Sequence, residues 1–142
     1  MTLEELQEQV DKDLKINDTE LDLESLKTPQ LHNKYLKHYN NFKLLLTRAE
    51  SDCKILKRVK WEYYTGKASP QVYQQKPFNL KIMKSDIDKY LESDEELIKA
   101  KQKIDYLETV VNYLDRTLKI IGGRDWQIRN SIEWRKFTSG AI

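Results

Sequence analysis

Residues 97–121 read LIKAKQKIDYLETVVNYLDRTLKII, and apolar side chains recur along this stretch with a heptad period. No polar side chain interrupts the recurring positions, so the spacing predicts a long helix with a coiled-coil seam on one face. Lys119 in the last turn, followed by Gly122 and Gly123, marks the C-terminal end of this helix. The seam positions are Leu97, Ala100, Ile104, Leu107, Val111, Leu114, Leu118 and Ile121.

A second long helix is predicted upstream. Thr28 followed by Pro29 favours a helix start, because threonine caps helices and proline suits the first position. Nothing breaks the pattern before Gly66, so we expect one helix of about 55 Å. A compact domain of this size has a radius of gyration of only about 15 Å, so the seams must meet another chain or fold back as a hairpin, and self-association is the more economical arrangement. The expected apolar face of this helix runs through Leu31, Tyr35, His38, Phe42, Leu45, Ala49, Asp52, Leu56, Val59 and Tyr63.

Shorter elements are predicted around the two long helices. Thr2 with Glu5, and Ser93 with Glu96, fit the capping-box pattern of helix starts. Four Gly and three Pro are too few turn signals for a sandwich or barrel of short strands. The sequence therefore predicts an all-α, elongated protomer with long helices and a C-terminal coiled-coil-like oligomerisation helix. The remaining expected elements are a helix at 2–15, a linker at 16–27, a loop at 66–77, a helix at 80–91 and a last helix at 125–138 closed by Gly140.

The composition argues against several classes of protein. With 34% charged residues the chain is too charged for a membrane span, so we expect no membrane association. A single cysteine, Cys53, and the absence of a signal-peptide pattern favour a reducing cytoplasm. Only His32 and His38 accompany this cysteine, too few ligands for a usual zinc site. No phosphate loop, nucleophile elbow or zinc motif occurs, so we expect no catalytic residue, metal or cofactor. The one enzymatic alternative is a site assembled from scattered carboxylates or across subunits.

The charge is unevenly distributed along the chain. Residues 1–24 carry 9 acidic and 2 basic groups, whereas residues 25–84 carry 13 basic and 3 acidic groups. Within the basic block, residues 54–67 read KILKRVKWEYYTGK and interleave cations with aromatic rings. That mixture is typical of single-stranded nucleic acid binding, because cations contact phosphates and rings stack on unpaired bases. Alternatively, Trp61 and Tyr64 pack in the core while the lysines face water. The candidate DNA-binding residues are Lys54, Lys57, Arg58, Lys60, Trp61, Tyr64 and Lys67.

The same segment carries a resemblance to a known family. Its ending, residues 63–66, is similar to the Tyr-Tyr-Ser-Gly of the UvsY family, the recombination mediators of T-even-type bacteriophages. The family has a short basic motif just before this ending that is associated with single-stranded DNA binding. The two basic positions of that motif fall on Arg58 and Lys60, with the Lys and Arg types exchanged, and Lys57 replaces an apolar residue. The likeness extends along the chain, from the opening at residues 3–7 to the ending at residues 135–137.

The resemblance implies a non-enzymatic protein that binds single-stranded DNA and loads a RecA-like recombinase onto DNA covered by single-strand DNA-binding protein. It also implies a homo-oligomer, a ring of six or seven subunits, in the cytoplasm of the bacterial host. We expect residues 1–92 to form an N-terminal helical region with the basic DNA-binding helix, and residues 93–142 a C-terminal oligomerisation region. A structural coiled-coil oligomer or a protein-interaction adaptor without DNA binding is the alternative. The expected oligomerisation residues are Leu97, Ile104, Leu107, Val111, Leu114, Leu118 and Ile121.

Overall fold

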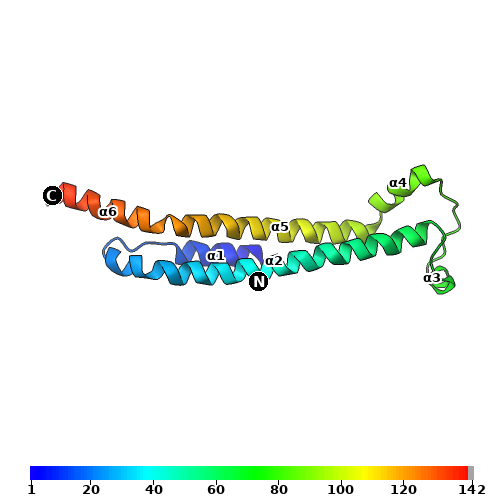
Figure 1. Ribbon diagram of the computed structural model, residues 1–142, viewed down its shortest axis with the longest axis horizontal. Helices are drawn as coiled ribbons and strands as arrows, with labels where there is room; N and C mark the ends of the chain where they lie inside the picture. Colours follow the sequence, from blue (N-terminus) through cyan, green and yellow to red (C-terminus); the bar gives the residue numbers. More distant parts are fainter. Residues whose placement is uncertain (141–142) are drawn as a thin grey trace. The chain divides into compact units, whose positions relative to one another are not determined.

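The computed structural model describes residues 1–140, and every regular element among them is helical. Two helices are long, with 44 residues in α2 and 28 in α5. The predicted all-α class with long helices is therefore confirmed. The elements are α1 (Leu3–Asp13), α2 (Leu21–Tyr64), α3 (Pro70–Gln75), the 3-10 turn η1 (Lys84–Asp86), α4 (Ile87–Glu92), α5 (Glu95–Gly122) and α6 (Arg124–Ser139) (Figure 1).

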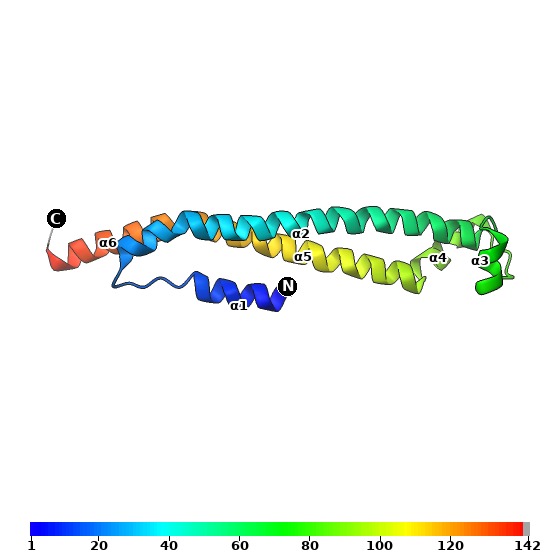
Figure 2. The same ribbon diagram turned by 90° about the horizontal axis from the view of Figure 1, so that it is seen from below.

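These helices form two compact units, and both α2 and α5 contribute residues to each. Unit 1 comprises residues 1–42 together with the described residues from 109 onward, and unit 2 comprises residues 43–108. Within each unit a part of α2 runs beside a part of α5 (Figures 1 and 2). The sequence favoured self-association over a hairpin, whereas within each unit the chain folds back on itself. These units are defined by packing and not by function. The expected division into a DNA-binding region, residues 1–92, and an oligomerisation region, residues 93–142, therefore stays a prediction.

In unit 1 a buried tyrosine of α2 is hydrogen-bonded to α1. Tyr35 of α2 is 0% exposed, and its hydroxyl donates to the Asp13 carboxylate of α1 at 2.8 Å. Lys34 forms an ion pair with the same carboxylate at 2.6 Å. Burial and the neighbouring Asp13 charge raise the pKa of Tyr35 well above its usual value. The apolar core of this unit contains Leu6, Val10, Leu21, Phe42, Val110, Val111, Leu114, Ile121 and Ile128.

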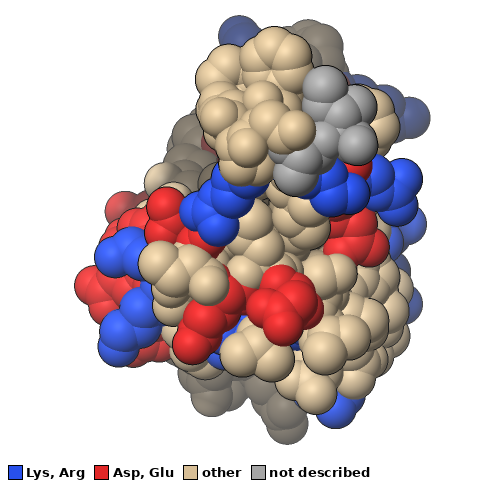
Figure 3. All heavy atoms as spheres, turned by 90° about the vertical axis from the view of Figure 1, so that its left-hand side faces the viewer, with Lys and Arg blue, Asp and Glu red and all other residues tan. Residues whose placement is uncertain are grey.

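Figure 3 views the molecule from the end at which α2 begins. Basic and acidic side chains lie next to one another on this face. In unit 1, Arg135 of α6 and Asp18 form an exposed ion pair at 3.5 Å. Because both signs of charge are interspersed, this face lacks the uniformly positive field that attracts a polyanion. The candidate surface for nucleic acid must therefore be sought elsewhere.

The predicted apolar face of α2 is only partly correct. Leu45 and Val59 are 49% and 45% exposed, and Asp52 is exposed as well. From Phe42 the buried stripe continues instead through Leu46. Because residues 44–46 are all leucine, the sequence allows two apolar faces with 3-4 spacing, one through Leu45 and the other through Leu46. The two leucines are equally hydrophobic, so only packing against α5 determines which of the two faces is buried.

The predicted start of α2 at Thr28–Pro29 is wrong. The helix begins at Leu21 and includes the proline, so part of the expected linker at 16–27 is helical. A proline inside a helix lacks the N–H group that would bond to the preceding turn. The carbonyl that Pro29 leaves without its helical donor is that of Ser25, and next to it the backbone oxygen of Glu24 accepts a hydrogen bond from the Arg124 guanidinium. A tertiary contact thus lies on the turn of α2 that precedes the proline.

Two further predictions between the long helices need correction. The segment 66–77, expected to be a loop, contains α3. The helix expected at 80–91 is shorter and consists of η1 followed by α4. Helices of one or two turns bury too few side chains to produce a recognisable apolar period. Among prolines and irregularly spaced apolar residues, they cannot be recognised from the sequence.

Apart from the start at Thr28–Pro29, one predicted helix cap is wrong. The capping box of Thr2 and Glu5 is present at the start of α1, α2 ends before Gly66, and α6 is closed by a left-handed Gly140. At the start of α5, however, the cap is Asp94, whose Oδ1 accepts a hydrogen bond from Leu97 N at 3.0 Å. A carboxylate is the better cap here because its charge also interacts favourably with the helix dipole.

The end of α2 depends on a left-handed glycine. Gly66 has φ +78°, and the amide of Lys67 donates to the carbonyl of Glu62 at 2.8 Å, as in a Schellman motif. A Cβ at Gly66 would meet no atom within 4 Å, so only backbone strain opposes a side chain. We expect Gly66→Ala to lower the free energy of unfolding by about 1–2 kcal/mol in urea titrations. Gly122→Ala, also with open space, should be neutral or stabilising, and equal losses would contradict this account.

Candidate nucleic-acid interface

The basic segment 54–67 forms the last part of α2 and the turn after it, all within unit 2. Lys54, Lys57 and Arg58 are exposed. Residues at i, i+4 and i+7 share a helix face, so Lys54, Arg58 and Trp61 lie along one line. Among residues 1–140, no ion pair joins Lys54, Lys57 or Arg58 to a carboxylate. Their charges are therefore available to an external anion.

Trp61 lies at the end of this row of cations. Its side chain is 39% exposed, although tryptophan is usually largely buried. The Lys67 ammonium lies 4.5 Å from the centroid of the ring, a cation–π distance. The structure thus brings together an aromatic surface and a cation that the sequence placed six residues apart.

Lys60, by contrast, is turned toward α5. Its side chain is 13% exposed, and its ammonium lies 3.3 Å from Asp94 and 3.5 Å from Glu96. Lys76 contacts the same Glu96 carboxylate at 3.3 Å. Two carboxylates already neutralise Lys60, so it joins α2 to α5 and presents little free charge to solvent. Its part in DNA binding stays a prediction, and this network argues for a positioning role instead.

Tyr64 also faces the interior of unit 2. Its hydroxyl donates to Asp94 at 2.6 Å, and burial together with that charge raises the pKa of Tyr64. The ring contacts those of Tyr63, Phe78 and Tyr90 at centroid distances of 5.2, 5.3 and 5.7 Å. Of the two aromatic candidates, Tyr64 therefore packs within the unit while Trp61 is the more open. We call Tyr63, Tyr64, Tyr73, Phe78 and Tyr90 the aromatic cluster.

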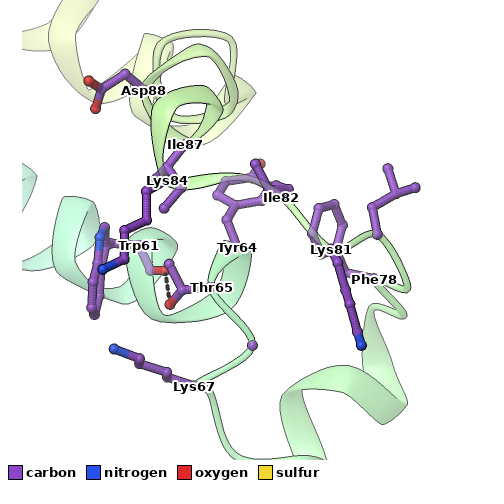
Figure 4. A pocket seen from close by; sticks show the side chains of 12 residues that line it. Trp61, Tyr64, Thr65, Lys67, Phe78, Lys81, Ile82, Lys84, Ile87 and Asp88 are labelled. Atoms are coloured by element: carbon purple, nitrogen blue, oxygen red, sulfur yellow. Dashed lines mark hydrogen bonds between the residues drawn. The ribbon is translucent and has the colours of Figure 1, made fainter.

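A pocket of about 740 Å³ opens beside Trp61 and the aromatic cluster (Figure 4). In this view Lys67 and Lys84 extend toward the Trp61 ring, while Phe78 and Lys81 lie at the opposite side of the pocket. Lys81 and Lys84, which line this pocket, are not among the candidates predicted from the sequence. Their spacing from Phe78, at i+3 and i+6, repeats the mixture of ring and cation seen in the segment 54–67 and could have indicated them.

Two other kinds of site are absent from the described part of the chain. Residues 1–140 hold no group of three or more His, Cys, Asp or Glu side chains arranged to bind a metal ion. Within the same residues, no helix combines the length and the apolar character needed to cross a membrane. The basic segment and its pocket are therefore the strongest candidate site.

Comparison with known proteins bears directly on this site. The sequence model of one protein family matches residues 9–141, which include the whole basic segment. The chain belongs to the UvsY family. That family is described as "Recombination, repair and ssDNA binding protein UvsY", so the resemblance carried by residues 54–67 is confirmed.

Relatives of the UvsY family match the chain over almost its full length. The recombination protein uvsY of Enterobacteria phage T4 is 25% identical over 140 residues, which are 99% of each protein. A crystal structure of the bacteriophage T4 recombination mediator protein UvsY, lattice type II, has a TM-score of 0.86 at 25% identity and 98% coverage of both chains. The lattice type IV structure has a TM-score of 0.83 at 23% identity, over 97% of this chain and 99% of the T4 chain. The fold is therefore that of these UvsY structures.

The residues predicted for oligomerisation lie largely in the chain's own core. Five of these seven residues are at most 6% exposed, and the other two, Ile104 and Leu118, are half-buried. The chain's own helices therefore cover this seam without a second copy, and its role between subunits stays a prediction. On α6, large apolar side chains are exposed instead. The five buried seam residues are Leu97, Leu107, Val111, Leu114 and Ile121.

The Asp94 network predicts a loss of stability in acid. Burial acts to raise the pKa of Asp94, but hydrogen bonds from Tyr64 and from the Leu97 amide, with the Lys60 charge, outweigh it and lower the pKa. A depressed pKa stabilises the fold above about pH 4, the unfolded value, and this stabilisation is lost as the pH falls through the folded pKa. We expect urea titrations of Asp94→Asn to depend less on pH below about pH 4 than those of the wild type. Asp88→Asn, at an exposed position, should follow the wild type, and parallel curves for all three would contradict the role of Asp94.

Proposed function

We propose that this protein is a recombination mediator that binds single-stranded DNA and promotes loading of a RecA-like recombinase onto DNA covered by single-strand DNA-binding protein. The observation that carries the proposal is the exposed row of Lys54, Lys57 and Arg58 beside Trp61, in a chain of the UvsY family. The action redistributes proteins on DNA without making or breaking covalent bonds. It therefore needs no catalytic residue, metal or cofactor, and it would take place in the cytoplasm of the bacterial host.

Within this function, the candidate residues have different roles. The exposed cations hold phosphates, and Trp61 offers a surface on which an unpaired base can stack. Lys60 and Tyr64, which both contact Asp94, act as positioning residues that fix the end of α2 against α5. Lys67, which lies over the Trp61 ring, links the row of cations to the pocket.

A ring of six or seven subunits would strengthen each weak site. Copies of one basic patch that share a strand bind it far more tightly than any patch alone, because later contacts are intramolecular. DNA that follows such a ring is bent away from the form held by the competing single-strand DNA-binding protein. This weakens the competitor's hold and presents the strand to the recombinase. The proposed division keeps DNA binding in residues 1–92 and assembly in residues 93–142.

The exposed face of α6 makes the assembly testable. Trp134 and Phe137 are 65% and 68% exposed, and their rings stack with centroids 5.8 Å apart. Large exposed apolar side chains commonly mark contacts between proteins. We expect Trp134→Ser with Phe137→Ser to yield smaller species in sedimentation, with helical content unchanged.

The buried seam provides the contrast for this experiment. Leu114 is 0% exposed in unit 1, so Leu114→Asp places a charge in the core and should lower helical content as well as assembly. A fully assembled Trp134→Ser, Phe137→Ser variant would contradict the use of α6. A folded but dissociated Leu114→Asp variant would instead support the seam as the subunit interface.

The function itself is tested by two measurements on the wild-type protein. Labelled single-stranded oligonucleotides should bind more tightly than duplexes, and the logarithm of the affinity should fall linearly with the logarithm of salt concentration. The protein should also accelerate recombinase assembly on a strand precoated with single-strand DNA-binding protein. Absence of binding at low salt would favour the structural oligomer or adaptor. Binding without acceleration would reject the loading role.

A further inference from the structure

We propose that the pocket beside Trp61 receives one unpaired nucleobase of single-stranded DNA, while Lys67, Lys81 and Lys84 contact the phosphates next to that base. The inference rests on the proposed function and gives it a defined subsite. The pocket lies wholly within unit 2, between the end of α2 and the segment 78–88.

The size and lining of the pocket suit a flat apolar ring system. Its volume of about 740 Å³ lies within the range of small-molecule sites. Phe78 and Tyr64 contribute ring surfaces, whose centroids lie 5.3 Å apart with nearly perpendicular planes. Ile82 and Ile87 add aliphatic surface, and Figure 4 shows Ile82 and Tyr64 between Lys84 on one side and Lys81 on the other. Such walls stack on and enclose a base without reading its sequence.

The pocket is held in shape without a ligand. The Tyr73 hydroxyl donates to the carbonyl of Tyr63 at 2.8 Å and accepts from the amide of Ala68 at 3.3 Å. The Tyr63 hydroxyl donates to the carbonyl of Lys76 at 3.1 Å. These bonds tie the segment after α2 back to the helix, so Phe78 is fixed at the pocket. A site that is formed in advance loses less conformational entropy when it binds.

The charges around the pocket select an anion. Three lysines line it, Lys67, Lys81 and Lys84, against one carboxylate, Asp88. In the described part of the chain none of these lysines forms an ion pair. An apolar interior with a cationic rim matches a nucleotide, in which an aromatic base is attached to a charged phosphate.

Continuity with the basic face of α2 favours DNA over an acidic peptide. Trp61 belongs both to the line of Lys54 and Arg58 and to the lining of the pocket, so one strand can follow the cations into it. The Lys67 ammonium now covers one face of the Trp61 ring. Stacking of a base on tryptophan is stronger than an exposed cation–π contact, so the base displaces Lys67 and frees it for a phosphate.

The test compares two oligonucleotides of about ten nucleotides that have equal charge. One is thymidine throughout, and the other is abasic throughout. We expect the wild-type protein to bind the thymidine strand at least about 10-fold more tightly, because only that strand can fill the pocket. Leu80→Asp, at a 63% exposed lining position, should lose this preference. Leu44→Asp, 70% exposed and elsewhere in unit 2, makes the same change of side chain and should keep the preference.

A second variant tests the phosphate contacts. Lys81→Ala with Lys84→Ala should reduce the slope of log affinity against log salt by about 1.4, since each contact to a single strand contributes about 0.7. An unchanged slope would overturn the role of these lysines.

The outcomes separate the pocket from the proposed function. Equal, measurable affinity of the wild type for the two strands would overturn the base site while leaving DNA binding in place. The base site would also be overturned if Leu80→Asp still bound the thymidine strand more tightly than the abasic strand. If neither strand binds at low salt, both the site and the function fail. If the strands bind equally and an acidic peptide binds the wild type but not Leu80→Asp, the pocket belongs to a protein partner and the proposal is wrong.

Discussion

Replacing Arg124 by alanine is expected to lower the free energy of unfolding by about 3 kcal/mol, since breaking a buried ion pair leaves one charge without compensation. The Arg124 side chain is 3% exposed and the Glu24 side chain 4% exposed. The guanidinium donates hydrogen bonds to the side-chain carboxylate of Glu24 and to its backbone carbonyl. It also donates to the Thr28 hydroxyl at 3.2 Å. Lys27, which lies 2.8 Å from the Glu24 carboxylate, is retained in the variant, so the expected loss is at the lower end for such pairs.

An exposed pair in the same unit is the control for this prediction. Arg135→Ala removes an arginine whose partner, Asp18, is 81% exposed, and it should change stability by less than about 1 kcal/mol. Replacing both Arg124 and Glu24 by leucine should be less damaging than Arg124→Ala, because no charge is left buried. Urea titrations followed by circular dichroism would measure all three. Equal losses for Arg124→Ala and Arg135→Ala would contradict the importance of the buried pair.

Neutralising the row of cations on α2 is expected to weaken single-stranded DNA binding about 100-fold near physiological salt. The variant is Lys54→Ala, Lys57→Ala and Arg58→Ala together. Each phosphate contact is taken as about 1 kcal/mol, and 1.4 kcal/mol corresponds to a tenfold change in affinity. The salt slope should fall by about 2, because three contacts of about 0.7 each are removed. Folding should be unaffected, since all three side chains are exposed.

The matched control removes three lysines from α5 in the same unit. Lys99→Ala, Lys101→Ala and Lys103→Ala lower the net charge by the same amount at exposed positions outside the pocket. Fluorescence anisotropy at several salt concentrations should show nearly wild-type affinity for this control. Equal weakening in both triple variants would mean that net charge, and not the row beside Trp61, attracts DNA.

Local patterns in the sequence determined most of the helices. The heptad of α5 is visible because its apolar positions have one consistent spacing, and its end is marked by Gly122. The capping box at Thr2 and the glycine after α6 are likewise local signals, since a cap and a left-handed turn involve only neighbouring residues. The basic and aromatic composition of residues 54–67 also indicated the candidate surface without any tertiary information.

Tertiary structure decided which side chains of those helices face inward. Lys60 and Tyr64 look like their exposed neighbours in the sequence, and only the approach of Asp94 turns them into a buried network. The pocket forms when the segment after α2 folds back on that helix, so the sequence showed no connection of Lys81 and Lys84 to Trp61. Arg124 and Glu24 are 100 residues apart, yet they meet on the turn of α2 that precedes Pro29. Such contacts depend on distances in space between residues remote in sequence, and a local pattern holds no information about those distances.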